Sequence, residues 1–140
     1  MKKGFFTFVL ALLGSFSFSQ SLHKGNLLGL HTYTPNLKPG ITIQDYTKFY
    51  TSTVIPEFEK AFPDIKLYLL KSVRGQDSSS IAVVYFFNSE AVRNKYFKND
   101  GTPTEVFNAA NAKLSDLGKE TDKYETSSNT PDKYNDWLVE

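Results

Sequence analysis

Cysteine is absent from the 140-residue sequence, so the chain can form neither disulfides nor thiolate metal sites and has no thiol nucleophile. Histidine is scarce: only His23 and His31 occur, and no acidic residue lies at ligand spacing from His31. Two imidazoles alone do not make a standard zinc site. A glycine-rich phosphate-binding loop is also missing. We therefore expect no metal site and no cofactor.

An excess of charge of either sign is missing as well. The sequence holds 16 Lys and Arg against 15 Asp and Glu. Nucleic acids and anionic membranes are bound through clustered positive charge. We therefore expect no nucleic-acid partner and, once the N-terminal segment described next is removed, no membrane association.

The N-terminal segment has the pattern of a secretory signal peptide. Lys2 and Lys3 precede an apolar stretch from Phe5 to Leu13, and small and polar residues follow it. The apolar stretch is too short to cross a bilayer. We expect residues 1–19 to be removed, with cleavage near Ser19-Gln20, and residues 20–140 to be periplasmic or secreted.

Alternating and helical hydrophobic patterns divide residues 20–140 into short elements. The clearest is a hairpin within Ile65–Asn88, whose two apolar strands are joined by the polar turn Gly75–Ser80. The other expected elements are a strand at 27–34, a helix at 42–62, helices at 90–97 and 102–117, a possible strand at 121–128, and a final strand or extended tail at 134–139. Pro56 should kink the first helix near Ser52, and Gly118 should end the last helix.

The order strand, helix, strand, strand, helix, strand predicts one α+β domain over residues 20–140. This order is that of a ferredoxin-like βαββαβ fold. We expect a four-stranded antiparallel sheet with both helical segments on one face. No interdomain linker or internal repeat interrupts the pattern.

The two hairpin strands are apolar on both faces. Tyr68 and Leu70 alternate with Leu67 and Leu69, and Ile81–Phe87 is apolar or aromatic throughout. A monomer with helices on one face of its sheet would expose a large apolar patch on the other. Two sheets packed face to face would bury this patch, so we expect a homodimer.

Three stretches give the chain a resemblance to a known group of proteins. They are LLGLHTYT in the first strand, VIPEFEKAF in the first helix, and YFFNSEAVRNKYF, in which a strand runs directly into a helix. From Leu27 to the C-terminus the layout resembles the dimeric α+β barrel superfamily, which includes antibiotic-biosynthesis monooxygenase-like, NIPSNAP-like and stress-responsive barrel proteins. The resemblance implies a dimeric barrel, ligands between helices and sheet, and a C-terminal strand that reaches over the partner. Because the superfamily spans oxygenases, haem enzymes and degrading enzymes, it implies a fold more than a reaction.

A candidate ligand site follows from the first strand, where Gly29, His31 and Tyr33 share a face. We hypothesise a mostly apolar cavity between the first helix and the sheet, with His31 as its main polar or catalytic group. The expected ligand-binding residues are Tyr33, Tyr46, Tyr50 and Tyr85. Gly29 would leave room for a ligand or a packed ring. The alternative is that His31 and the tyrosines only pack within a core or interface.

Two functions remain open, and with them the question of whether the chain is an enzyme. One is an exported dimer that binds a small apolar or aromatic molecule or has a structural role. It is favoured because no acid–base pair and no metal ligand set is visible. The other is a cofactor-independent, monooxygenase-like enzyme acting on an aromatic or polyketide-like molecule, as the resemblance allows.

Overall fold

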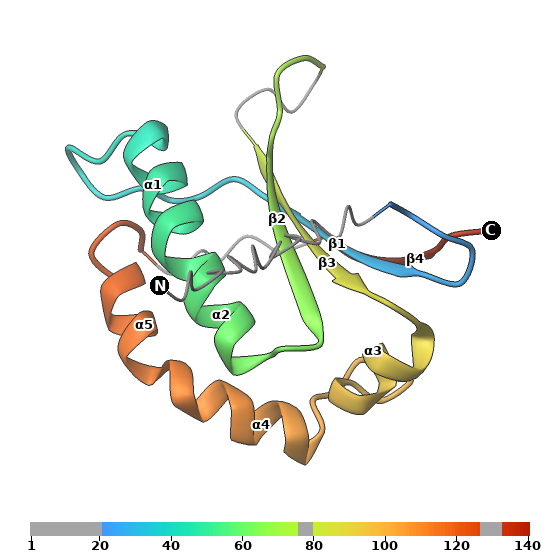
Figure 1. Cartoon of the computed structure of the whole chain (residues 1–140). Helices are drawn as coiled ribbons and strands as arrows, with labels where there is room; N and C mark the ends of the chain where they lie inside the picture. The colour runs from blue at the N-terminus through green and yellow to red at the C-terminus, as the bar shows by residue number, and fades with distance from the viewer. Residues whose placement is uncertain (1–20, 76–79, 127–132) are drawn as a thin grey trace, which may run out of the picture.

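The computed structural model describes residues 21–75, 80–126 and 133–140 as a four-stranded sheet with helices on one face (Figure 1). The strands are β1 (Leu27–Tyr33), β2 (Ile65–Lys71), β3 (Ile81–Phe87) and β4 (Lys133–Leu138). All neighbouring strands pair antiparallel in the order β2-β3-β1-β4. This order, with helices following β1 and β3, confirms the predicted ferredoxin-like fold. The predicted signal peptide at 1–19 lies outside the described residues.

The first helical segment is held at its start by a capping box and interrupted where Pro56 was expected to disturb it. It consists of α1 (Ile43–Phe49), a π-helical turn (Tyr50–Val54) and α2 (Ile55–Ala61). Thr42 caps α1: its hydroxyl accepts from the Asp45 N–H, while the Asp45 carboxylate accepts from the Thr42 N–H. Pro56 lacks an N–H and sits in the first turn of α2, directly after the wide turn. The predicted irregularity near Ser52 is therefore a π turn.

The second helical segment is broken into α3 (Glu90–Tyr96), α4 (Glu105–Asn111), a 3₁₀ turn (Ala112–Leu114) and α5 (Ser115–Thr121). Ser89 caps α3 and Thr104 caps α4 through their hydroxyls. Gly118 was expected to end the last helix, and this was wrong. It lies inside α5, where nothing crowds it and the cost of a helical glycine is only about 1 kcal/mol.

The prediction of a possible strand at 121–128 was also wrong, because residues 121–126, its described part, form no strand. Thr121 ends α5, a turn follows, and only Glu125 forms an isolated bridge, with Leu37. The cause is tertiary: the Tyr124 ring stacks on Phe49 at 4.1 Å between centroids, which fixes the chain against α1. Residues 127 and 128 lie outside the described part of the chain. The fourth strand is β4, close to the expected 134–139.

Strand alternation and register divide the sheet into two faces. The helix face carries Leu27, Gly29, His31 and Tyr33 of β1, Ile65, Leu67 and Leu69 of β2, Ile81, Val83, Tyr85 and Phe87 of β3, and Tyr134, Asp136 and Leu138 of β4. The open face carries Leu28, Leu30 and Thr32, Lys66, Tyr68 and Leu70, Ala82, Val84 and Phe86, and Lys133, Asn135 and Trp137. His31 and Tyr85 therefore lie on the same face of the sheet, a register that the sequence alone had left open.

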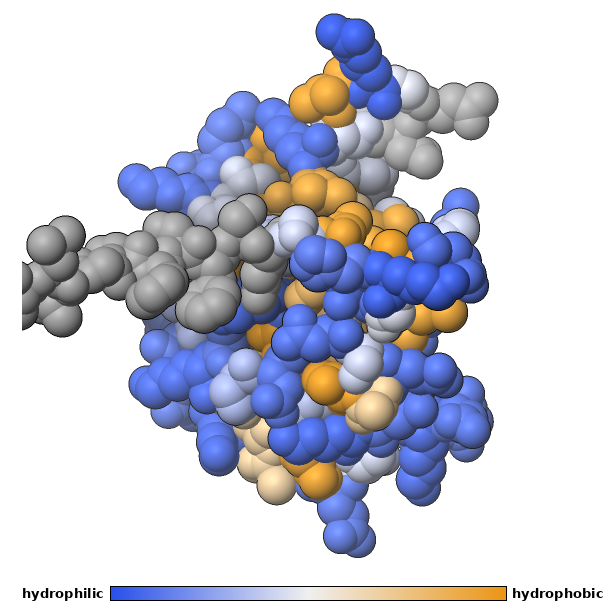
Figure 2. Space-filling view, turned by 45° about the vertical axis from the view of Figure 1, so that its right-hand side comes forward, coloured by the Kyte–Doolittle hydropathy of each residue, from blue (hydrophilic) through white to orange (hydrophobic). Residues whose placement is uncertain are grey.

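The hydrophobic core lies between the helix face and the helices. Phe62, Ile65 and Phe87 are fully buried there, and the Phe62 ring contacts Phe58, Tyr96 and Phe107. The open face carries large hydrophobic side chains that remain exposed, and Figure 2 shows hydrophobic residues reaching the surface among hydrophilic ones. Across the described ranges, no helix has the length and apolarity needed to cross a bilayer.

Candidate functional site: a cavity under the helices

A cavity of about 390 Å³ opens between the helix face and the helices α2, α3 and α4. Its lining residues are His31, Phe58, Tyr85, Arg93, Phe97, Gly101, Phe107, Asn111 and Tyr134. The sheet contributes His31, Tyr85 and Tyr134, and the remaining residues come from the helices and the α3–α4 connection. The hypothesised site lay between the first helix and the sheet, whereas this cavity lies under α2, α3 and α4.

Aromatic rings form most of the cavity wall. The Phe58 ring meets Tyr85 edge-to-face at 5.7 Å, and the Phe97 and Phe107 rings lie 4.9 Å apart. Such pairs hold one another in place, because offset and edge-to-face arrangements are the favoured ones for aromatic rings. The wall therefore presents ring faces and edges of fixed orientation to whatever enters.

His31 stands on the sheet floor of the cavity between two tyrosines. Its ring lies 5.7 Å from Tyr134, edge-to-face, and 6.1 Å from Tyr33. Gly29 precedes it on the same face, and a Cβ atom there would lie 2.5 Å from the Tyr134 hydroxyl. The space left by Gly29 is therefore filled by a packed ring, one of the two occupants considered from the sequence.

An ion pair closes the cavity at the β4 edge, and sequence reasoning missed it. The Arg93 Nε donates to the Asp136 carboxylate at 3.0 Å, and its Nη1 donates to the Lys98 and Phe97 carbonyls. The Tyr134 hydroxyl donates to the same carboxylate at 2.6 Å. Burial, followed by this hydrogen bond, raises the pKa of the Tyr134 hydroxyl. The sequence shows that Tyr134 and Asp136 share one face of the last strand. It contains no pattern, however, that places this strand beside α3.

Three of the predicted ligand-binding tyrosines lie beside the cavity instead of lining it. Tyr33 and Tyr46 share a hydrogen bond of 3.0 Å between hydroxyls, and the Tyr46 and Tyr50 rings lie 5.9 Å apart. Burial is the main cause that raises the pKa of all three phenols, and the nearby Glu125 carboxylate adds to it. They are neutral hydrogen-bonding groups at any physiological pH. Only Tyr85 of the four predicted tyrosines lines the cavity together with His31.

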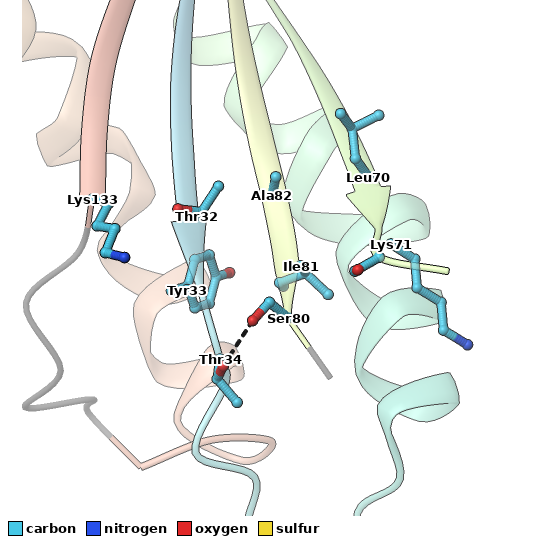
Figure 3. Close-up of a pocket in the computed structure, with 10 residues that line it drawn as sticks. Thr32, Tyr33, Thr34, Leu70, Lys71, Ser80, Ile81, Ala82 and Lys133 are labelled. Atoms are coloured by element: carbon cyan, nitrogen blue, oxygen red, sulfur yellow. Dashed lines mark hydrogen bonds between the residues drawn. The ribbon is translucent and has the colours of Figure 1, made fainter. Parts of the chain in front are cut away.

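A second hollow, also of about 390 Å³, lies at the other end of the strands, where β1 and β2 finish and β3 and β4 begin (Figure 3). Its lining includes Thr32, Leu70, Ala82 and Lys133 of the open face, and the Thr34 and Ser80 hydroxyls bond to each other at 3.0 Å. Tyr33 also borders it. In the described part of the chain, no group of three His, Asp or Glu residues is placed to hold a metal ion.

No family model matches the chain, and neither does any curated protein. Among solved structures, the chain is similar to a crystal structure described as a dimeric protein of unknown function and ferredoxin-like fold from Bacteroides fragilis NCTC 9343. The two are 13% identical, the match covers 83% of this chain and 98% of that chain, and the TM-score is 0.35. The strand order β2-β3-β1-β4 by itself defines the fold of this chain.

Proposed function

We propose that the chain is an exported homodimer that binds a small, planar, neutral aromatic molecule in the cavity under the helices. The observation that carries this proposal is the cavity itself: ring walls around one imidazole, within a volume typical of small-molecule sites. His31 and the Asn111 amide supply hydrogen-bonding groups, and Phe58, Phe107 and Tyr85 supply stacking surface.

The charge balance of the cavity favours a neutral ligand. Arg93 is the one residue of permanent charge in the lining, and Asp136 already neutralises it at 3.0 Å. A carboxylate ligand would have to compete with Asp136 for the guanidinium and would be desolvated in the process. A neutral aromatic ring with one hydroxyl or carbonyl group avoids this desolvation cost and can still form a hydrogen bond with His31.

Export and dimerisation rest on different features. Export is supported by the basic and apolar N-terminal pattern at Lys2, Lys3 and Phe5–Leu13. Dimerisation is supported by the open face, where Tyr68, Leu70 and Trp137 are 43%, 49% and 57% exposed beside the apolar Leu28, Leu30 and Val84. A second copy packed on this face would remove that apolar surface from water.

The ligand proposal is tested with 2-naphthol and 2-naphthoate as matched planar probes, one neutral and one anionic. Fluorescence titration of the mature chain should show 2-naphthol binding at least tenfold tighter than 2-naphthoate. His31→Ala should weaken 2-naphthol binding several-fold, while Tyr68→Ala on the open face should leave it unchanged. Equal affinity of His31→Ala and the parent, with the fold intact by circular dichroism, would refute a role for His31.

The same material separates binding from catalysis. A co-purifying aromatic molecule identified by mass spectrometry, and released unchanged, supports the binding function. Its consumption together with dissolved oxygen would instead identify a cofactor-independent oxygenase, the second function that the resemblance allows.

N-terminal sequencing of protein recovered outside the cytoplasm should begin near Gln20, and sedimentation at micromolar concentration should give the mass of two chains.

A further inference from the structure

We propose that Arg93 donates a hydrogen bond from its Nη2 nitrogen to a carbonyl oxygen of the ligand, so that the cavity under the helices selects aromatic molecules with a neutral carbonyl group. This inference rests on the proposed function and adds to it a specificity-determining residue and a narrower ligand class. It uses three observations: the fixed position of the guanidinium, the nitrogen that has no acceptor, and the charge that Asp136 already balances.

The Arg93 guanidinium is held by contacts to its edges and to its face. Its Nε donates to the Asp136 carboxylate at 3.0 Å, and its Nη1 donates to the carbonyls of Phe97 at 3.1 Å and Lys98 at 2.6 Å. Nη1 also lies 3.5 Å from the side-chain oxygen of Asn94. The guanidinium carbon lies 5.6 Å from the centre of the Phe97 ring. These contacts fix the plane and the rotation of the guanidinium before any ligand arrives.

The carboxylate that anchors this arrangement is itself fixed. One oxygen of Asp136 accepts from the Arg93 Nε, and the other accepts from the Tyr134 hydroxyl at 2.6 Å. Asp136 lies on β4 and Arg93 on α3, so the pair joins the sheet to a helix beside the cavity. A donor held in this way loses little side-chain freedom when a ligand binds to it.

The remaining nitrogen of the guanidinium, Nη2, donates to no residue in the described part of the chain. The Arg93 side chain is only 9% exposed. Among the described residues, however, no fully enclosed side-chain nitrogen lacks a partner, so Nη2 must adjoin open space. Arg93 borders the cavity next to Phe97 and Tyr134, and the cavity is therefore the space that Nη2 adjoins. An N–H group in such a place gains most from an acceptor that a ligand supplies.

The charge around Arg93 determines which acceptor fits. A guanidinium has donors only, so the ligand atom beside Nη2 must be an acceptor. A carboxylate accepts well, but it would share Arg93 with Asp136 and set two negative charges against one positive charge. A ketone, aldehyde or amide oxygen accepts the same bond without adding charge. The site therefore selects a neutral carbonyl oxygen.

Phe97 connects this donor to the aromatic wall of the cavity. Its ring contacts the guanidinium on one side and lies 4.9 Å from the Phe107 ring. A carbonyl group attached directly to an aromatic ring can place its oxygen at Nη2 while the ring packs against these two side chains. The shape and the polarity of this end of the cavity thus suit the same molecule.

Two probes of nearly the same shape test the carbonyl contact. 2-Acetylnaphthalene carries a ketone, and 2-isopropenylnaphthalene carries a CH₂ group in place of the ketone oxygen. Fluorescence titration of the mature chain should show the ketone binding about tenfold tighter or more, because a hydrogen bond from a charged donor is a strong one. Arg93→Lys keeps a cation for Asp136 but has no Nη2. This variant should lose the preference or reverse it, since the alkene is the more apolar probe.

Asp136→Asn is the matched control, because it disturbs the same ion pair from the other side and leaves Nη2 in the protein. The ketone preference should persist in this variant. 2-Naphthoate should bind to it several-fold tighter than to the parent, because the charge of Arg93 is no longer balanced. If Arg93 only supported the fold, both variants would weaken the two probes equally, and that result would overturn the inference.

An infrared spectrum of bound 2-acetylnaphthalene gives a readout that needs no variant. The carbonyl band of the complex with the parent protein should lie below its position in hexane, because a hydrogen bond to the oxygen weakens the C=O bond. A band at the hexane position, or equal affinity of the parent for the two probes, would refute the role of Arg93 and leave the aromatic cavity intact. If neither probe binds to the parent, the proposed function fails and this inference fails with it.

Discussion

The two faces of the sheet are built from the same strands and have opposite surroundings. On the helix face, Phe87, Ile65 and Val83 are at most 1% exposed. On the open face, Tyr68, Leu70 and Trp137 pair with Val84, Ala82 and Leu28 and stay about half exposed. Side-chain character therefore does not distinguish the faces. The helices cover one apolar surface, whereas the other keeps several large apolar side chains exposed, as docking surfaces often do.

The two hollows have the same volume and different walls. The cavity under the helices is lined by aromatic rings that contact one another and by Arg93, which pairs with Asp136. The hollow at the end of the strands is lined by hydroxyls, lysines and small apolar groups from strand ends. The first has fixed, oriented walls that suit a small planar ligand.

The largest difference is expected between a ring removed from the core under the helices and a ring removed from the open face of the sheet. Phe62→Ala should lower the free energy of unfolding by about 3–5 kcal/mol, because a fully buried ring with three aromatic neighbours leaves a cavity. Tyr68→Ala should cost about 0.5 kcal/mol or less in dilute protein, where association does not contribute. Urea unfolding measures both. Equal losses would remove the distinction between the faces, whereas a Tyr68→Ala cost that grows with protein concentration would sharpen it.

The next effect concerns the ion pair that joins the helix face to α3. The Arg93 side chain is 9% exposed and the Asp136 side chain 26%, so breaking the pair leaves a charge largely desolvated. Arg93→Met should cost about 2–3 kcal/mol, somewhat less than for a fully buried pair. Asp136→Asn should cost a similar amount, and the double variant less than the sum. Strictly additive losses in denaturant unfolding would show that the pair does not couple.

Gly29→Ala should have a smaller effect, about 1–2 kcal/mol of destabilisation. The added Cβ would lie 2.5 Å from the Tyr134 hydroxyl, which its bond to Asp136 holds in place. In a Tyr134→Ala background the same substitution should cost nothing. Gly118→Ala is the matched control, because it meets no atom within 4 Å and should stabilise α5. Thermal unfolding that shows the same sign at both glycines would contradict this.

The smallest effect lies outside both faces, at the start of α1. The Thr42 hydroxyl, and then its N–H, hold the pKa of Asp45 below its usual value of 3.8. A lowered folded-state pKa stabilises the protein above the unfolded-state value, and this contribution disappears as the pH falls through the lowered pKa. Thr42→Ala should therefore reduce the melting temperature slightly at pH 7 and less at pH 3. Asp45→Asn, which can still accept the capping bonds, should abolish the difference between the two pH values.

Local patterns were enough to predict most of the fold. The turn signals around Ile65–Asn88 and the apolar positions of the first helix predicted the order of the elements, whereas the register that puts His31 and Tyr85 on one face came only from the structure. The site was harder, because its walls come from segments whose pairing depends on long-range contacts. Arg93 and Asp136 are 43 residues apart in the chain, and neither belongs to a local motif. The turn after α5 was misassigned for the same reason, since Tyr124 is held by Phe49.

The π turn at Tyr50–Val54 has a consequence for insertions and deletions in this helix. Tyr50 and Phe58 both face the sheet side, yet eight residues of regular α-helix would leave them about 80° out of phase. The wider turn, in which the Ile55 N–H reaches back to the Tyr50 carbonyl, takes up much of that angle. Seven residues of regular helix would align the same two rings to within about 20°. The segment could therefore be one residue shorter with both rings still on the sheet side, but only if Pro56 were replaced as well, because in a plain α-helix its ring would clash with the carbonyl four residues before it.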